Sequence, residues 1–258
     1  MLDVGNESVP TFVDLDADGD LDMLVANKID PTDLRTSLVH VFTNEGSARA
    51  PRYRQTDSWE LLRQYHQVPA MGDLDGDGDM DMLVGTWNKG VAYFRNDGTA
   101  QQADFVLVDS VLIKLTRGSN AAPALVDIDA DGDLDLFVGE SSGELNFYRN
   151  VGDRSAAIFE LVSDNYQDID PGRRSFPTFA DWDGDGDMDL FLGSEAGGLQ
   201  LWLNEGGGAE PRFIRDEDFA VDLPRMSTPV FVDIDGDGDL DLLAGTLGGG
   251  VVWLKGGG

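Results

Sequence analysis

The chain has 258 residues, and its 49 acidic residues against 18 basic ones give a formal net charge of −31, which disfavours nucleic acid and anionic membranes as partners. The absence of cysteine excludes disulfides and thiolate metal sites. We expect no membrane insertion and no signal peptide in this chain, because it has no long apolar run and its first residues lack basic and apolar regions.

The predicted elements follow one order that recurs five times along the chain. A short apolar strand leads into an Asp-rich loop, and a second apolar strand leaves that loop. A Gly-rich turn, a third strand with aromatic residues and a short fourth strand complete the unit. Examples are first strands at 10–13, 177–180 and 229–232, a second strand at 189–193, third strands at 91–95, 145–149, 199–203 and 251–254, and fourth strands at 52–54, 104–108, 158–162 and 212–215.

This pattern predicts an all-β fold, a β-propeller of five blades with about four antiparallel strands each. We expect a single domain over residues 1–258, with blades at approximately 1–58, 59–112, 113–166, 167–218 and 219–258. The fifth blade should lack its fourth strand, because the chain ends soon after the third strand of the last unit. Two alternatives follow, a closed or nearly closed five-bladed ring and a segment of a larger array. We favour the ring, because terminal repeats are often atypical.

Five Asp-rich loops of nine residues are the strongest signal in the sequence. They start 59, 54, 54 and 52 residues apart, and each lies between the first and second predicted strands of a blade. Each loop holds five Asp, so the loops account for 25 of the 49 acidic residues. Such crowded carboxylates repel one another, and a hard divalent cation removes that repulsion. Ca²⁺ suits the loops best, because it takes six to eight oxygen ligands in a flexible shell.

We therefore predict about five Ca²⁺ ions, one in each loop. Loop positions one, three, five and nine should bind through side-chain carboxylates, and position seven through its backbone carbonyl. Glycine at position six permits the sharp turn. The predicted carboxylate ligands are Asp14, Asp16, Asp18, Asp22, Asp73, Asp75, Asp77, Asp81, Asp127, Asp129, Asp131, Asp135, Asp181, Asp183, Asp185, Asp189, Asp233, Asp235, Asp237 and Asp241. The predicted carbonyl ligands are those of Asp20, Asp79, Asp133, Asp187 and Asp239.

An EF-hand is the obvious alternative for such a loop, and it requires Glu at position twelve and flanking helices. Position twelve is apolar in all five loops, and strand-like residues follow. With the EF-hand excluded, the loops and their predicted strands resemble the FG-GAP/VCBS-type repeats of integrin α-subunit propellers and many bacterial secreted proteins. The resemblance covers nearly the whole chain and implies Ca²⁺ binding through positions one, three, five, seven and nine.

We expect the Ca²⁺ ions to be structural. The propeller should then act as an extracellular or cell-surface adhesion module that binds a protein or carbohydrate ligand at its blade loops. One alternative is a lectin with sugar sites between blades, for which Trp87 is the best exposed candidate. Trp59 is a further candidate, whereas Trp202 and Trp253 are predicted to pack and Trp182 to lie in the core.

A second alternative is an accessory domain of a secreted polysaccharide-degrading enzyme. No catalytic motif is visible, so we expect the chain itself not to be an enzyme. His40 in a third strand and His66 in a linker are most simply read as surface or strand residues. The ligand, the source and the oligomeric state stay open at this stage.

Overall fold

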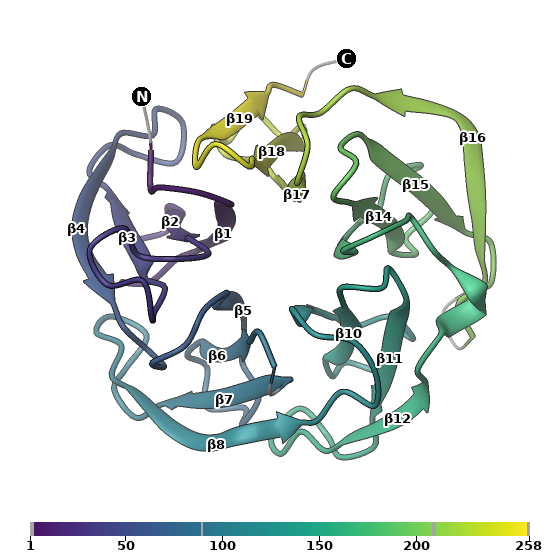
Figure 1. The fold of residues 1–258 in the computed structure, drawn as a ribbon, viewed down its shortest axis with the longest axis horizontal. Coiled ribbons are helices and arrows are strands. Elements are labelled where there is room, and N and C mark those ends of the chain that lie inside the picture. Colours follow the sequence, from purple (N-terminus) through teal and green to yellow (C-terminus); the bar gives the residue numbers. More distant parts are fainter. Residues whose placement is uncertain (1–2, 89, 208–209, 257–258) are drawn as a thin grey trace.

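The computed structural model describes residues 3–88, 90–207 and 210–256. Five antiparallel sheets stand around a central axis as the blades of a propeller (Figure 1). Four sheets have four strands and the fifth has three. The predicted five-bladed, all-β propeller with a three-stranded last blade is therefore confirmed.

The strands of blades one to three follow one another in chain order. Blade one consists of β1 (Val9–Val13), β2 (Asp22–Ala26), β3 (Val39–Asn44) and β4 (Tyr53–Trp59). Blade two consists of β5 (Val68–Gly72), β6 (Asp81–Gly85), β7 (Val91–Asn96) and β8 (Phe105–Ile113). Blade three consists of β9 (Ala122–Val126), β10 (Asp135–Gly139), β11 (Leu145–Asn150) and β12 (Phe159–Ser163).

Blades four and five complete the ring. Blade four consists of β13 (Phe176–Ala180), β14 (Asp189–Gly193), β15 (Leu199–Asn204) and β16 (Phe213–Val221). Blade five consists of β17 (Thr228–Val232), β18 (Asp241–Gly245) and β19 (Val251–Leu254). Strands β4, β8 and β16 end at Trp59, Ile113 and Val221, slightly beyond the blade limits expected from the sequence.

The core lies between neighbouring blades. Every residue of the second strands β2, β6, β10, β14 and β18 is buried, because each of these strands has a neighbouring blade on both sides. Between blades three and four, for example, Phe137 and Phe147 pack in one cluster with Leu190 and Leu192. Face-to-face packing of apolar sheets explains why the second strands are continuous apolar runs rather than alternating ones.

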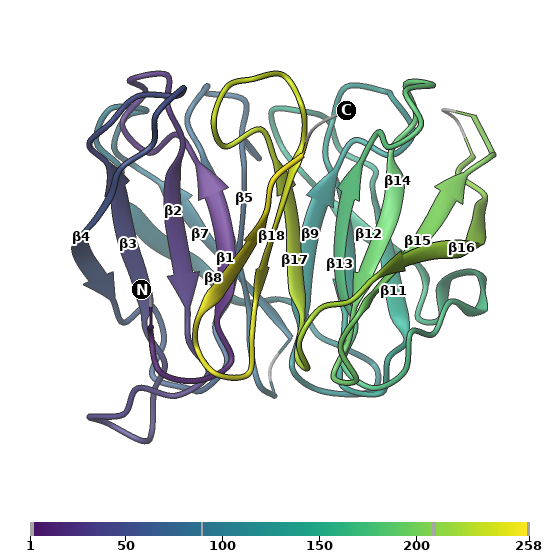
Figure 2. The same cartoon turned by 90° about the horizontal axis from the view of Figure 1, so that it is seen from above.

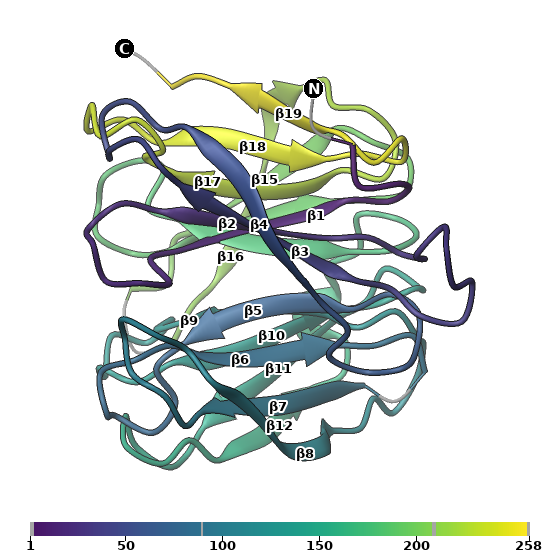
Figure 3. The same ribbon diagram turned by 90° about the vertical axis from the view of Figure 1, so that its left-hand side faces the viewer.

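The ring closes between the first and last blades. The N–H of Val4 donates to the carbonyl of Gly249 at 3.1 Å, and the N–H of Ser8 donates to Thr246 at 3.2 Å. The N-terminal residues therefore lie beside the turn that joins β18 to β19 (Figure 1 and Figure 3). In the part of the chain that the structure describes, one short 3-10 turn at Tyr166–Asp168 is the only helical element, and no helix has the length and apolarity to cross a membrane.

Candidate metal centres and the central channel

The Asp-rich loops join the first and second strands of each blade. The first strands run along the central axis in the same direction. All five loops therefore lie on one face of the ring, here called the loop face (Figure 2). The order of strand, loop and strand is the one expected from the sequence.

Each loop is folded around the carboxylate of its first Asp. The N–H of the glycine at position six donates to that carboxylate at 3.0–3.2 Å in all five loops. This glycine has a φ between 90° and 96°, in the left-handed region that other residues rarely adopt. The N–H of position seven donates to the carboxylate of position five at 2.9–3.1 Å. The loop backbone thus turns its carboxylates toward a common centre.

The Asp at position nine is the first residue of the second strand, and it is buried in every blade, with an exposed fraction of 1–3%. One of its oxygens accepts a backbone N–H at 2.7–2.8 Å, from the last residue of the third strand in blades one to four and from Gly256 in blade five. In four loops its other oxygen accepts the N–H of position two at 2.9–3.3 Å. This carboxylate therefore holds the loop against the sheet.

The carboxylates of each loop come together closely enough to share one ion. In every loop, three carboxylates offer one oxygen each within 4.8 Å of one another. The three belong to positions one, three and five in the first three loops, and to positions one, three and nine in the last two. The groups are Asp14, Asp16 and Asp18; Asp73, Asp75 and Asp77; Asp127, Asp129 and Asp131; Asp181, Asp183 and Asp189; and Asp233, Asp235 and Asp241.

The loops contain buried oxygen atoms whose hydrogen-bonding capacity is not used. Buried carboxylate oxygens of Asp14, Asp20, Asp79, Asp135 and Asp235 have no hydrogen-bond partner. A buried charged oxygen without a partner is costly, and a metal ion satisfies it. All the donors are oxygens, which favours a hard cation such as Ca²⁺ over a soft one. The residues present therefore fit a Ca²⁺ ion.

The electrostatics of the loops point the same way. Burial raises the pKa of Asp22 and of Asp81 to about 6, and that of Asp135 to about 7. Burial also raises the pKa of Asp20 and Asp79, with the neighbouring loop carboxylates adding to the effect. These carboxyl groups are hard to ionise without a compensating cation. Position seven was predicted to bind through its backbone carbonyl alone. Its side-chain carboxyl group nevertheless interacts electrostatically with the other carboxylates of the loop.

In the part of the chain that the structure describes, basic side chains form ion pairs with carboxylates of two loops. Lys255, which follows β19, forms ion pairs with Asp235 and, at 2.9 Å, with Asp237 of loop five. Arg149 on β11 lies 3.5 Å from Asp129 of loop three. These contacts were not predicted from the sequence. The two basic residues are equivalent, because each directly follows the third-strand residue that pairs with the second residue of the second strand. They partly neutralise the loop that they touch.

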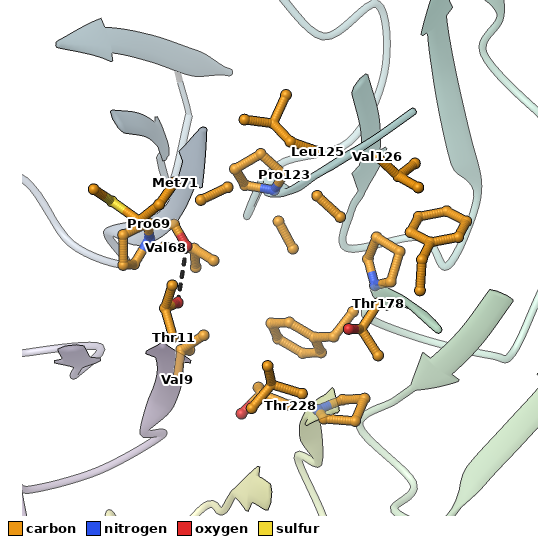
Figure 4. Close-up of a pocket in the computed structure, with 18 of the residues that line it drawn as sticks. Val9, Thr11, Val68, Pro69, Met71, Pro123, Leu125, Val126, Thr178 and Thr228 are labelled. Atoms are coloured by element: carbon orange, nitrogen blue, oxygen red, sulfur yellow. Dashed lines mark hydrogen bonds between the residues drawn. The ribbon is translucent and has the colours of Figure 1, made fainter. Parts of the chain in front are cut away.

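The first strands surround a central cavity of about 470 Å³ (Figure 4). Its lining is mostly apolar, with Pro69, Pro123 and Leu125 among the labelled residues, and the hydroxyl of Thr11 donates to the carbonyl of Pro69 at 3.1 Å. Among the described residues, Asp127 is the one titratable side chain in the lining, and it belongs to loop three. At the end away from the loops, three residues of a buried apolar cluster line the cavity. The cluster contains Val68, Ala122, Phe176 and Met226.

The tryptophans differ from the sequence-based prediction in two places. Trp182 was expected in the core, yet 48% of it is exposed, and Trp253 was expected to pack, yet it is also 48% exposed. Both flank the place where a fourth strand of blade five would lie. Trp202 is partly buried against the cluster between blades three and four, as expected. Trp87 is 39% exposed, and Trp59 packs on Phe105 at 5.5 Å between ring centroids.

The two histidines also differ from each other. His40 lies in β3 and contacts Ser58 at 3.0 Å, in agreement with a strand residue. The prediction of a surface or strand position for His66 was wrong, because it is 3% exposed at the end of the ring opposite the loops. Burial, together with the positive charges of Arg174 and Lys28, lowers the pKa of His66 to about 3. A linker position in the sequence gave no signal of this burial, which neighbouring blades create.

A comparison with protein families gives one match. A model of the FG-GAP-like repeat matches residues 14–84, 73–138, 127–192 and 181–244, and each match runs from one Asp-rich loop through the next. No curated protein matches the chain. The matched segments together cover most of the 258 residues.

Proposed function

The chain belongs to the FG-GAP-like repeat family, and from this premise we propose that it binds five Ca²⁺ ions, one in each loop of the loop face. One observation carries the proposal: in all five blades, three carboxylate oxygens lie within 4.8 Å of one another. Positions one, three, five and nine supply the carboxylates, and position seven supplies its carbonyl. The repetition of one arrangement five times argues against a chance cluster of acids.

The proposed role of Ca²⁺ is structural. Its charge offsets the repulsion among the carboxylates and compensates the buried Asp at position nine, which joins the loop to the second and third strands. Ion binding and folding are then linked, because the unfolded chain has no such site. Dissociation constants of about 10⁻⁴–10⁻³ M are typical of extracellular Ca²⁺ modules. This range suits our proposal that the protein works outside the cell or at its surface.

We further propose that the propeller is a recognition module rather than an enzyme. The central cavity is mainly apolar, and Asp127, the one titratable side chain among the described residues that line it, belongs to loop three. The connecting loops, held in place by Ca²⁺, offer the surface for a protein or carbohydrate ligand. This is the adhesion role that the repeat family suggested.

Isothermal titration of the metal-free protein with CaCl₂ tests the proposal. We expect about five ions per chain, and weaker binding of Mg²⁺, which demands a small octahedral shell. The variant Asp77→Ala removes an exposed carboxylate of loop two and should reduce the stoichiometry to about four. A stoichiometry near zero for wild type, confirmed by metal analysis after dialysis, contradicts the proposal.

Glycan binding is a second candidate function, favoured by one place on the surface. Trp87 is exposed, and Asn88 and Gly90, close behind it in the chain, line a cavity of about 350 Å³ together with Lys114 and Ser119. An exposed aromatic ring beside polar side chains is suited to stacking on a sugar. A glycan array with wild type and Trp87→Ala tests this role. Signals that Trp87→Ala abolishes support it, and an array without signals rejects it.

A further inference from the structure

The fourth strands, which form the rim of the ring, differ from blade to blade in the side chains that they expose (Figure 1). On β4 every exposed side chain is polar or charged, and on β16 most are. On β8, by contrast, four large apolar side chains are 36–52% exposed. They are Val106, Leu107, Val108 and Val111.

Strand β8 also lies at the edge of its sheet. The sheet of blade two has the order β5-β6-β7-β8, so among the residues that the structure describes β8 pairs with β7 alone. At nine residues it is nearly twice as long as β12, the other rim strand with several exposed apolar side chains. A long, apolar edge strand favours association with another strand, and exposed apolar patches mark interaction surfaces.

The sequence of β8 is self-complementary. Residues 106–113 read Val-Leu-Val-Asp-Ser-Val-Leu-Ile, which is three apolar residues, two polar residues and three apolar residues in either direction. Two copies that lie antiparallel about a two-fold axis between Asp109 and Ser110 therefore match apolar with apolar residues throughout. The opposed pairs are Val106 with Ile113, Leu107 with Leu112, Val108 with Val111 and Asp109 with Ser110. No like charges are opposed in this arrangement, which like-charge repulsion would otherwise weaken.

Strand β12 lacks this property. Its sequence is Phe-Glu-Leu-Val-Ser, and a two-fold axis at its central Leu161 would oppose Glu160 to Val162. A carboxylate placed against an apolar side chain in a contact is unfavourable. The apolar residues of β12 therefore do not fit a second β12 as those of β8 fit a second β8.

The centre of β8 contains a bulge, which falls on the polar pair. Pairing with β7 shifts after Leu107 and again after Asp109. The carboxylate of Asp109 accepts the N–H of Val111 at 2.8 Å, so this N–H has its partner within the strand. Contact between two copies of β8 consequently depends on the apolar side chains on either side of the bulge rather than on one continuous set of backbone hydrogen bonds.

Charge also favours the antiparallel arrangement. Strand β8 begins near the loop face, because Phe105 pairs with Asn96, whose N–H donates to Asp81 at 2.8 Å. It ends near the opposite face, where the exposed Lys114 follows. Antiparallel strands turn the acidic loop faces of two copies to opposite sides, which limits the repulsion expected from a formal charge of −31. They also place Lys114 of each copy opposite Phe105 and beside Asp104 of the other.

We infer that β8 binds β8 of a second copy of this chain, in a two-fold dimer whose two strands lie antiparallel at the rim of blade two. The dimer leaves both loop faces uncovered and directs them to opposite sides. If the proposed recognition role holds, the dimer is bivalent and gains avidity for a repeated ligand. The dimer itself depends on neither ligand recognition nor Ca²⁺ affinity, because it rests on the rim strand alone.

Sedimentation equilibrium of the intact protein in CaCl₂, over a wide range of concentrations, tests the inference. We expect the mass to rise with concentration from 27.9 kDa to twice that value. Val108→Asp places a carboxylate in the apolar contact and should raise the dissociation constant of the dimer at least about tenfold. Val162→Asp is the matched control, since Val162 on β12 is 54% exposed and Val108 is 52% exposed, and it should leave the constant unchanged. Thermal melting checks that both variants are folded.

A charge reversal tests the antiparallel arrangement. Lys114→Asp and Asp104→Lys should each weaken the dimer several-fold at low salt, because each places like charges beside one another. The double variant should restore the wild-type dissociation constant. A wild-type protein that stays monomeric, or a dimer that Val162→Asp weakens as much as Val108→Asp does, overturns the inference. A double variant that is no tighter than the single variants overturns it too.

Discussion

The two faces of the ring are stabilised in different ways. On the loop face, five groups of carboxylates lie close together and several of their buried oxygens lack partners. On the opposite face, the acidic residue that precedes the first strand of blade one has its cationic partners within the protein. Glu7 pairs with Lys28 at 2.5 Å and with Arg174 at 2.8 Å, and all three side chains are largely buried.

Hydrogen bonds between neighbouring blades complete the opposite face. The N–H of Ser8 donates to Thr246, and the N–H of Ser175 donates to Glu140 at 3.1 Å. The protein therefore supplies both charges of the ion pairs on the opposite face, whereas the loop face carries mainly negative charges. Loss of a cation should weaken the loop face alone, whereas changes to the ion pairs should act equally with and without Ca²⁺.

The largest effect is expected for Asp189→Ala. Asp189 is 1% exposed and accepts the N–H of Asn204 at 2.7 Å and that of Trp182 at 2.9 Å. Its removal leaves two N–H groups unsatisfied, which costs about 2–4 kcal/mol of unfolding free energy. We expect this loss in EDTA and a greater loss in CaCl₂, measured by urea denaturation.

Asp185→Ala is the control for that variant. Asp185 is exposed at position five of the same loop, and in EDTA its removal loses only an exposed hydrogen bond from the N–H of Asp187 at 2.9 Å, so its removal should lower stability mainly in CaCl₂. Equal behaviour of the two variants in EDTA contradicts the anchoring role of position nine.

Arg174→Gln tests the opposite face. The change removes the 2.8 Å ion pair with Glu7 and leaves the pair with Lys28. Breaking a largely buried pair should cost about 2–3 kcal/mol. The loss should be the same in EDTA and in CaCl₂, measured by denaturation in both. A loss confined to one condition would show that the two faces are coupled.

His66 predicts acid sensitivity of the opposite face. Its folded pKa of about 3 is lower than its ordinary value of 6.5, so the folded state resists protonation and stability falls as the pH drops below about 6.5. At pH 5 the cost is about 2 kcal/mol. His66→Asn suits the left-handed backbone, as the equivalent Asn120 does, with φ values of 55° and 57°. The stability difference between wild type and this variant should shift by that amount between pH 7.5 and pH 5, and a constant difference is the contrary result.

The smallest effect is expected for Lys255→Met. Lys255 pairs with Asp235 and Asp237, which raises its own pKa and opposes a cation in loop five. Its removal should tighten Ca²⁺ binding there several-fold, followed by the amide signal of Gly238 in an NMR titration. The amide of Gly186 in loop four is the internal reference, because the equivalent residue there is Leu203. Weaker binding in the variant contradicts competition by the lysine.

Features encoded within one repeat could be predicted from the sequence. The five loops, the order of strands and the three-stranded last blade all follow from patterns less than 60 residues long, and the structure confirms the fold. A loop such as 181–189 carries its turn glycines and its carboxylates in nine consecutive residues, so its shape depends little on distant contacts.

Features created between blades could not be predicted in the same way. Trp182 was placed in the core because position two is apolar in the other loops. In loops two and three, however, that position is covered by Phe159 and Phe213, which begin the fourth strand of the next blade. His66 was placed in a surface linker, yet Phe176, more than 100 residues away, lies against its ring at 6.3 Å. The pairing of Lys255 with loop five likewise depends on where the fifth blade ends.

Thermal unfolding of the wild-type protein in EDTA, in MgCl₂ and in CaCl₂ at equal ionic strength tests the central claim most directly. With five sites of about 10⁻⁴–10⁻³ M, 10 mM Ca²⁺ contributes about 1.4–2.7 kcal/mol per site, or about 7–14 kcal/mol in all. We predict a midpoint at least 10 °C higher in CaCl₂ than in EDTA, using roughly 2–4 °C per kcal/mol for a chain of this size, and a much smaller rise in MgCl₂. Identical midpoints in CaCl₂ and EDTA would contradict the account.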